Sequence, residues 1–436
     1  MSIKGKVLRY IYWTSDFFKG RPIRCQYDDI KKILENNEQG TLLRSQYLTD
    51  ILQYAVKHTA YYKNISSDDL NNFPVVNKNI LRENYTLIRV PEEAIPNQRG
   101  NVHIQHTSGS TGTPFHVPQD TRKRNRRIAE LKYFGNVVGF YSHEKLIHLR
   151  IWTKWHNKSK WQSFRENIIA FDISNLKKER LSELCSVINK EKAVCLRGYA
   201  SSFDLLVRYV MENRHMSFPS LSVIIAGSEA LQDATRENVQ KHLGCNIISQ
   251  YANEENGIMA QETIGTDDNG FYLNHASYIF EVLKMDSDQP AAYGELGRIV
   301  ITDLFNYAFP MIRYDTGDLG VLAPPNEHSN GYPYLSKLYG RRMDLVYTVS
   351  GEPVSPMSLG RVLKYYSEIN QWQFIQKAKK EYVLKIVLSG EHFSKAAEVK
   401  KELCDTFGQD ANIQIEYVND IPVLNSGKRK PVICEL

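Results

Sequence analysis

The chain has 436 residues, of which 42% are hydrophobic and 24% are charged, and its formal net charge is +6. This composition is typical of a globular protein, and the length predicts two or three domains. The small positive charge does not indicate a nucleic-acid-binding protein, and no apolar run reaches the roughly 18 residues that a membrane-spanning helix needs.

The N-terminal segment, residues 1–24, is basic and aromatic ("MSIKGKVLRYIYWTSDFFKGRPIR"). It lacks the continuous apolar core of a signal peptide. Two arrangements fit its pattern: an amphipathic helix packed on the protein body, which the pattern favours, and a helix that lies on an anionic membrane surface as a peripheral association. The cysteines are scattered and form no C-x-x-C pair, which is typical of reduced thiols, so we expect a cytoplasmic protein.

The middle of the chain alternates strand and helix patterns. "LSVIIAGSEAL" (221–231) is a short apolar run that ends in a Gly-Ser turn, and residues 233–243 follow with helical spacing. "CNIISQYANEENG" (245–257) repeats the strand and then continues as a polar loop. Strands that alternate with helices predict an α/β body.

The C-terminal part has a different pattern. It contains the strand "DLVYTV", a helix opened by Pro356, a hairpin made of "QWQFIQKA" and "YVLKIVLS", a helix that ends at Gly408, and the strand "NIQIEYV". This order predicts a small α+β domain. We place the boundary in "YGRRMDL", with a large domain over residues 1–340 and a small domain over residues 341–436.

The stretch "HTSGSTGTPFHV" (106–117) combines glycines with hydroxyl side chains. Glycines let the backbone turn sharply and approach a ligand, and exposed N–H groups in such a turn hold anions such as a polyphosphate. No Gly-Lys-Ser/Thr sequence ends the stretch, so it is not a Walker loop, and its lysine must come from elsewhere. The alternative is a flexible linker.

Three further motifs carry polar groups in loops. In "QYANEENG", Glu254 and Glu255 follow a predicted strand, where a carboxylate suits Mg²⁺ beside phosphates; the alternative is a solvated acidic loop. In "RYDTGDLG", an Asp in a Gly turn suits the two hydroxyls of a ribose; the alternative is a plain turn. In "PVLNSGKRK", Lys428 supplies the charge that the first loop lacks; the alternative is a basic tail.

In order and combination, these motifs resemble the adenylate-forming enzyme superfamily, which includes acyl-CoA synthetases and aryl-acid and amino-acid adenylating domains. "TSGSTGTP" resembles its phosphate loop, "YANEE" its Tyr-Gly-x-Thr-Glu element, "YDTGD" its Tyr-Arg-Thr-Gly-Asp element, "GRRMD" its hinge and "PVLNSGK" its C-terminal lysine loop. "HTAYYKN" and "FPVVNKNILREN" resemble the phenylacetate–CoA ligase and CapK branch, whose CapK-like members are associated with capsular polysaccharide synthesis. The resemblance runs from about residue 58 to residue 433.

The resemblance implies a large adenylate-forming body and a small, mobile C-terminal domain. It implies an AMP-forming ligase that uses ATP and Mg²⁺ to activate a carboxylic or amino acid and passes the acyl group to CoA or to an amine. The residues that it places around the ATP phosphates are Thr107, which we also count as catalytic, Ser108, Gly109, Ser110, Thr111, Gly112 and Thr113. The other implied roles are Gly227, Ser228 and Glu229 beside the adenine, Tyr251 near the base, Asp318 and Arg341 at the ribose, Glu255 on Mg²⁺, and Lys428 at the carboxylate and α-phosphate.

The chain departs from the superfamily pattern at a few positions. Ala252 and Glu254 replace the usual Gly and Thr, so that Glu254 is either a second metal ligand or points away. The hinge has Met343 where an Asp or Lys is common. A non-catalytic nucleotide-binding protein that keeps the fold is the alternative function, and the intact Lys428, Asp318 and Glu255 argue against it.

Three other stretches suggest chemistry that we do not adopt. In "HEKLIH" the histidines, His143 and His148, are five residues apart, so they do not face the same side of a helix as in H-E-x-x-H. "RKRNRR" (122–127) is interpreted as the solvated face of a helix, and no nucleic-acid partner is expected. "WTKWHNKSKW" (152–161) is either a lid over an acyl pocket or a surface loop.

Overall fold

The computed structural model describes the chain except for residues 1, 107–114, 151–158, 175, 266–268, 342–345, 355, 364–365, 367, 391–392 and 423–429. Its contacts divide the chain into two units. The first unit comprises Met1–Leu146, Lys160–Ile168 and Gln250–Leu338, and the second comprises Ile147–Ser159, Ile169–Ser249 and Tyr339–Leu436.

The first unit begins with helices whose first turns are capped by side chains. The Ser2 hydroxyl accepts from Gly5 N at 3.1 Å at the start of α1 (Ile3–Phe18), and Asn36 caps α3 (Asn37–His58) in the same way. Such caps satisfy backbone N–H groups that have no partner inside the helix. The other helices of this unit are α2 (Pro22–Glu35), α4 (Lys78–Glu83), α5 (Tyr85–Ile88), α6 (Thr121–Val137), α7 (Lys160–Glu166) and the short 3₁₀ helices η1 (Leu70–Asn72) and η2 (Glu92–Ala94).

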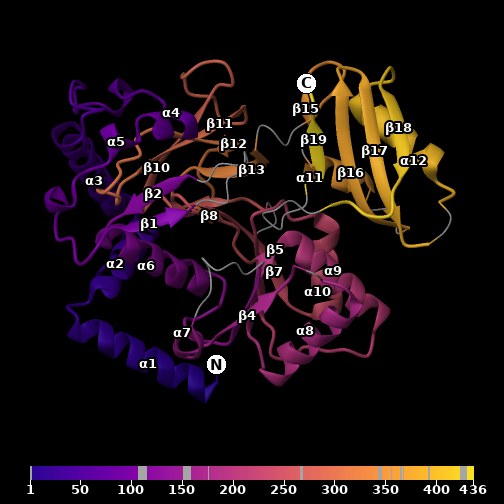
Figure 1. Cartoon of the computed structure of the whole chain (residues 1–436), viewed down its shortest axis with the longest axis horizontal. Helices are drawn as coiled ribbons and strands as arrows, with labels where there is room; N and C mark the ends of the chain where they lie inside the picture. The colour runs from indigo at the N-terminus through magenta and orange to yellow at the C-terminus, as the bar shows by residue number, and fades with distance from the viewer. Residues whose placement is uncertain are drawn as a thin grey trace. The chain divides into compact units, whose positions relative to one another are not determined.

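The strands of the first unit form antiparallel pairs. β1 (His103–His106) pairs with β2 (His116–Gln119), and β8 (Gly257–Gln261) lies between the end of β7 (Asn246–Asn253) and β9 (Tyr272–Leu273). A further sheet has the order β10 (Tyr278–Leu283), β11 (Leu296–Asp303), β12 (Tyr314–Ala323) and β13 (Tyr334–Arg341). Figure 1 labels these strands except β9.

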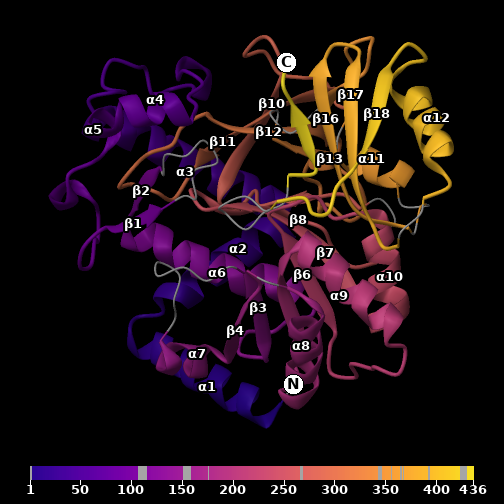
Figure 2. The same ribbon diagram turned by 45° about the vertical axis from the view of Figure 1, so that its right-hand side comes forward.

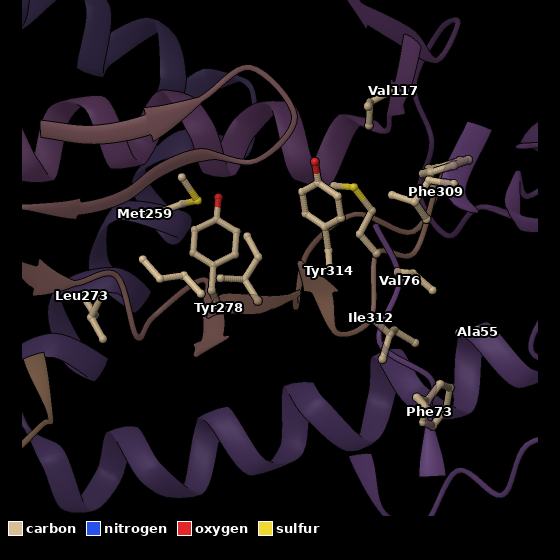
Figure 3. Close-up of a cluster of buried hydrophobic side chains, with 14 of the residues drawn as sticks. Ala55, Phe73, Val76, Val117, Met259, Leu273, Tyr278, Phe309, Ile312 and Tyr314 are labelled. Atoms are coloured by element: carbon tan, nitrogen blue, oxygen red, sulfur yellow. The ribbon is translucent and has the colours of Figure 1, made fainter. Parts of the chain in front are cut away.

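A cluster of buried apolar side chains joins the helices and strands of this unit. It draws Ala55 from α3, Val117 from β2, Met259 from β8 and Tyr314 from β12 into one core. Figure 3 shows part of it, with Tyr278 and Tyr314 among aliphatic and aromatic neighbours. The buried Tyr278 hydroxyl donates to the carbonyl oxygen of Asn256 at 2.6 Å, so its polar end is satisfied.

The α/β alternation predicted for the middle of the chain is confirmed in the second unit. The strand order is β4 (Ile168–Asp172), β3 (Leu146–Arg150), β5 (Cys195–Tyr199), β6 (Val223–Gly227) and β7 (Asn246–Asn253), and β5 and β6 run parallel. The helices α8 (Lys178–Lys190), α9 (Ala200–Glu212) and α10 (Asp233–Leu243) alternate with these strands. β7 begins in the second unit and ends in the first, at Asn253.

The C-terminal part forms a small α+β arrangement with its own core. β16 (Ile369–Ala378) and β17 (Glu381–Leu388) form the predicted hairpin, and its Phe374 and Tyr382 rings pack against the ring of Phe407, which follows later in the chain. α12 (Ala396–Phe407) lies beside β18 (Asn412–Tyr417) in both views (Figures 1 and 2). The elements of this part are β14 (Val346–Tyr347), β15 (Pro353–Val354), α11 (Pro356–Leu363), β16, β17, α12 (Ala396–Phe407), β18 (Asn412–Tyr417) and β19 (Val432–Cys434).

Two details bear on the predicted domain limits. Among the described residues of "DLVYTV", Val346 and Tyr347 form β14, and the helix predicted to open at Pro356 does begin there. The boundary predicted between residues 340 and 341 falls within β13 and stays a prediction.

Candidate active site

The predicted phosphate loop connects the two strands of a hairpin. Residues 107–114, which include every predicted loop position from Thr107 to Thr113, lie outside the described residues. On either side, His106 ends β1 and His116 begins β2, and the two residues pair in antiparallel register. Their Nδ1 atoms are 2.7 Å apart. The hairpin therefore brings both ends of the predicted loop together.

The turn between β7 and β8 is held rigidly by its own backbone. Asn256 N donates to the side chain of Asn253 at 2.7 Å, and Gly257 has a φ of +114°, a conformation that favours glycine. A Cβ at Gly257 would also lie 3.0 Å from Oε2 of Glu130. This conformation fixes the backbone of Glu255, which precedes the Asn-Gly pair.

Neighbouring elements hold the same turn from outside. The Gln119 side chain, from β2, donates to the carbonyl oxygen of Glu255 at 3.0 Å, and Arg127 donates to the carbonyl oxygen of Glu254 at 2.8 Å. The Glu254 carboxylate accepts from the side-chain amide of Gln105, in β1, at 2.8 Å. These bonds tie the β7–β8 turn to the hairpin that carries the predicted phosphate loop.

The Glu255 carboxylate is buried and faces a lysine from a distant part of the chain. Its Oε1 accepts from Lys78 Nζ at 3.0 Å, with the side chains 8% and 27% exposed. Lys78 is the first residue of α4, which is capped by Asn77, and its ammonium also lies 5.7 Å from the centre of the Phe115 ring. The predicted metal ligand thus has its negative charge balanced inside the protein.

Lys78 was missed as a site residue, although it lies within the quoted stretch "FPVVNKNILREN". That stretch is the only local sequence feature that points to Lys78. It indicated the branch of the superfamily, and it did not assign a role to this residue. Its partner Glu255 is 177 residues away along the chain.

Tyr251 and Asp318, predicted at the nucleoside, come together in the first unit. The Tyr251 hydroxyl donates to Oδ2 of Asp318 at 2.6 Å, and the Thr316 hydroxyl lies 3.2 Å from the same phenol oxygen. Burial raises the pKa of Tyr251 well above its ordinary value, and the neighbouring Asp318 carboxylate raises it further. The phenol therefore stays protonated and acts as the donor.

The Asp318 backbone is set by a tight turn in β12. Gly317 has a φ of +78° and donates its N–H to the Asp315 side chain at 2.9 Å, and Asp318 N donates to the Thr316 hydroxyl at 3.1 Å. The Thr316 hydroxyl donates in turn to the carbonyl oxygen of Ile299 at 2.9 Å. The "YDTGD" sequence therefore makes a turn in which the side chains of Asp315 and Thr316 hold the backbone just before Asp318.

The other predicted residues lie elsewhere in the chain. Gly227 ends β6, Ser228 has a φ of +66°, and Glu229 accepts at 2.9 Å from the backbone N–H of Ser201, in the first turn of α9; all of these belong to the second unit. Arg341 is the last residue of β13. Lys428 and Met343 lie outside the described residues, as does most of "WTKWHNKSKW".

The interpretation of "RKRNRR" as a solvated face is wrong for two of its residues. The stretch opens α6, but the side chains of Lys123 and Arg126 are fully buried. Lys123 pairs with Asp303 at 2.6 Å, and Arg126 pairs with Asp29. Because a buried charge needs a partner, these basic residues are structural members of the first unit.

Among the residues that the structure describes, no group of three or more His, Cys, Asp or Glu side chains could hold a metal ion. Glu255 nevertheless fits a divalent cation that arrives with a polyphosphate, because a hard cation prefers carboxylate oxygens and takes its other ligands from phosphates and water.

The chain is similar in sequence and in fold to known proteins. The family described as the CapK C-terminal domain matches residues 346–435. Protein CapK of Staphylococcus aureus is 23% identical over 454 residues, which cover 99% of this chain and 95% of that protein. These matches support the adenylate-forming superfamily, and within it the CapK and phenylacetate–CoA ligase branch. A phenylacetate-coenzyme A ligase of Pseudomonas putida is 26% identical over 85% of this chain and 77% of that protein.

A solved structure confirms the predicted fold class. The crystal structure of 2-hydroxyisobutyryl-CoA ligase in the postadenylation state, in complex with R3-HIB-AMP, matches with a TM-score of 0.70 and 16% identity, over 93% of this chain and 91% of that one. The chain therefore has the α/β body and the C-terminal α+β part of an adenylate-forming fold.

Proposed function

We propose that the protein is an ATP-dependent, AMP-forming ligase that activates a carboxylate as its acyl adenylate and transfers the acyl group to an acceptor. The observation that carries the proposal lies in the first unit. There, the buried Glu255 carboxylate and the Tyr251–Asp318 pair share one framework with the hairpin that flanks "TSGSTGTP". The hydrogen bond between Gln105 and Glu254 supports this grouping, because it joins two of the motifs directly.

In this proposal the nucleotide is held by groups of different kinds. The N–H groups and hydroxyls of residues 107–113 bind the phosphates. The Asp318 carboxylate accepts hydrogen bonds from the ribose hydroxyls, and the Tyr251 hydroxyl fixes its orientation. Gly227, Ser228 and Glu229 border the adenine, and Arg341 supports the ribose.

Glu255 is the residue that would hold Mg²⁺. Its carboxylate is buried and already oriented by Lys78, and a divalent cation would compete with the Lys78 ammonium for the same oxygen. When bound, Mg²⁺ neutralises phosphate charge and so reduces the repulsion between the triphosphate and an anionic nucleophile.

The first half-reaction converts a poor acylating agent into a good one. A carboxylate oxygen of the acid attacks the α-phosphorus of ATP, the bond from that phosphorus to the bridging oxygen breaks, and pyrophosphate leaves. Lys428, placed on the C-terminal loop by the resemblance, would offset the charge of the carboxylate and the α-phosphate. Catalysis then consists mainly of positioning and charge neutralisation.

The second half-reaction transfers the acyl group. A thiol or amine attacks the adenylate carbonyl carbon, AMP leaves with the bonding electrons, and the nucleophile loses its proton. CoA as the acceptor is supported by the match to phenylacetate-coenzyme A ligases. An amine is the alternative that the family resemblance implies, since CapK-like members are associated with capsular polysaccharide synthesis. The match to protein CapK covers almost the whole chain.

Product analysis tests the proposal and separates the acceptors. The purified protein with Mg²⁺ and ATP is assayed for pyrophosphate exchange across a panel of carboxylic and amino acids. CoA or an amino sugar is then added, and thioester or amide is detected by mass spectrometry. We expect AMP and pyrophosphate as products; formation of ADP and phosphate would exclude adenylation. A protein that binds ATP but gives no exchange would instead be a non-catalytic nucleotide-binding protein.

A further inference from the structure

The inner face of α1 packs on the body of the first unit. A Cβ at Gly5 would lie 2.8 Å from the carbonyl oxygen of His143, so only glycine allows the helix to approach so closely. About two turns further on, the Tyr12 ring packs against His143, and the Lys132 ammonium lies 3.9 Å from the centre of the Tyr12 ring. These contacts confirm that the helix is packed on the protein, as the sequence pattern favoured.

The outer face of α1 is apolar and exposed. At about 100° per residue, its apolar positions fall within an arc of roughly 120°, opposite the buried face. Ile3 is 83% exposed and Phe18, at the other end of the helix, is 81% exposed. We call this set the α1 stripe: Ile3, Val7, Tyr10, Ile11, Phe17 and Phe18.

The exposed apolar surface continues onto α7. Trp161 and Phe164 are both exposed, and their rings stack at 6.1 Å. The Lys4 ammonium lies 4.4 Å from the centre of the Phe164 ring, which places α7 beside the start of α1, and the two helices are adjacent in both views (Figures 1 and 2). Tryptophan is enriched where proteins meet the surface of a bilayer.

The charges beside the stripe have one sign. On the helical wheel Lys4 and Lys6 border it on opposite sides, and both are exposed. The single acidic residue of α1 is Asp16, which is buried and accepts from the backbone N–H groups of Ile23 and Arg24 at 3.0 Å, at the start of α2. The outer face therefore combines apolar side chains with flanking positive charge and carries no acidic group.

We propose that the α1 stripe docks on an anionic lipid surface, with its apolar side chains at the boundary between headgroups and acyl chains. Lysines that border an exposed apolar face complement anionic headgroups, whereas a second copy of the same stripe would bring like charges together. Among the described residues no helix is long and apolar enough to cross a membrane. In this proposal the α1 stripe lies on the membrane surface.

Vesicle binding tests the inference. The full-length protein is sedimented with vesicles of equal parts phosphatidylglycerol and phosphatidylcholine, and with vesicles of phosphatidylcholine alone. We expect binding to the anionic vesicles that falls at least about tenfold in the double variant Ile3→Ser/Phe18→Ser. The double variant Lys4→Gln/Lys6→Gln should lose about fivefold per lysine on the anionic vesicles and much less on the neutral ones.

The matched control is Leu42→Ser, because Leu42 is 71% exposed on α3 of the same unit but is not part of the stripe. It should bind as the unchanged protein does, and circular dichroism should show that all variants are folded. Failure of the unchanged protein to bind anionic vesicles would overturn the inference, as would equal binding by the stripe variant. A dimer in sedimentation equilibrium that the stripe variant dissociates, without vesicle binding, would assign the stripe to a second copy.

Discussion

The ion pair between Lys78 and Glu255 gives a prediction whose size follows from its geometry. At 3.0 Å and an effective dielectric constant near 20, the Coulomb attraction is about 5.5 kcal/mol before any correction. The Lys78 side chain is 27% exposed, so solvent screens part of this attraction, while Glu255 is buried and loses much of its hydration. We therefore expect Lys78→Met to lower the free energy of unfolding by about 1–3 kcal/mol.

The cost arises because the substitution leaves a buried carboxylate without its counter-charge. In a Glu255→Gln background that charge is absent, so the same Lys78→Met change should cost much less, with a coupling energy of about 1–2 kcal/mol. The assay is urea unfolding of the four proteins followed by circular dichroism. A chain of two units need not unfold in one step, so the comparison uses the transition in which Lys78→Met differs from the unchanged protein. If Lys78→Met lowers the free energy of unfolding equally in both backgrounds, the two charges are not coupled and the reasoning is refuted.

Three further predictions concern the nucleotide, the reaction and pH. Asp318→Ala should weaken ATP binding by about tenfold to a hundredfold, as measured by calorimetry. Tyr251→Phe should weaken it less, because this change removes only the hydroxyl that orients the Asp318 carboxylate. An unchanged ATP affinity in folded Asp318→Ala would exclude the role of Asp318 at the ribose. Lys428→Ala should reduce pyrophosphate exchange by about 10²- to 10³-fold, while acyl transfer from a supplied adenylate should survive. An equal loss of activity in both assays would show that the lysine does not serve the first step alone. Burial lowers the pKa of His143 from 6.5 to about 4 and that of His275 to about 3. The unfolded state then binds more protons below pH 6.5, so the free energy of unfolding should fall on acidification from about pH 6.5 to 4, by up to roughly 3 kcal/mol per histidine. His275→Gln should flatten this slope in urea unfolding at several pH values, and an unchanged slope would contradict the assignment.

The parts of the fold that depend on local periodicity were predictable from the sequence. The helix expected over residues 233–243 is α10, and the hairpin expected around the Lys-Lys-Glu turn is β16 and β17. In the helix and in the hairpin, the apolar residues recur with the period of the element. The residues that this spacing predicts to be buried are therefore the ones that the fold buries. The N-terminal segment also followed its pattern, since α1 has one face packed and one exposed.

The parts that depend on distant partners were not predictable. "RKRNRR" has the composition of a solvated face, and only the fold brings Asp303 and Asp29 to Lys123 and Arg126. The same is true of Lys78, whose position beside Glu255 follows from the placement of α4 against the β7–β8 turn. A sequence motif gives a residue type and its neighbours along the chain. It does not predict which distant residue the fold brings next to it.

The measurement that tests the central claim most directly is carboxylate-dependent exchange of labelled pyrophosphate into ATP, run across the acid panel with the unchanged protein and with Lys428→Ala. Adenylation predicts exchange with at least one acid, dependent on Mg²⁺, and its loss by about 10²-fold or more in the variant. Binding of Mg²⁺ and ATP without exchange for any acid, or conversion of ATP to ADP and phosphate, would contradict the assignment of this protein as an AMP-forming ligase.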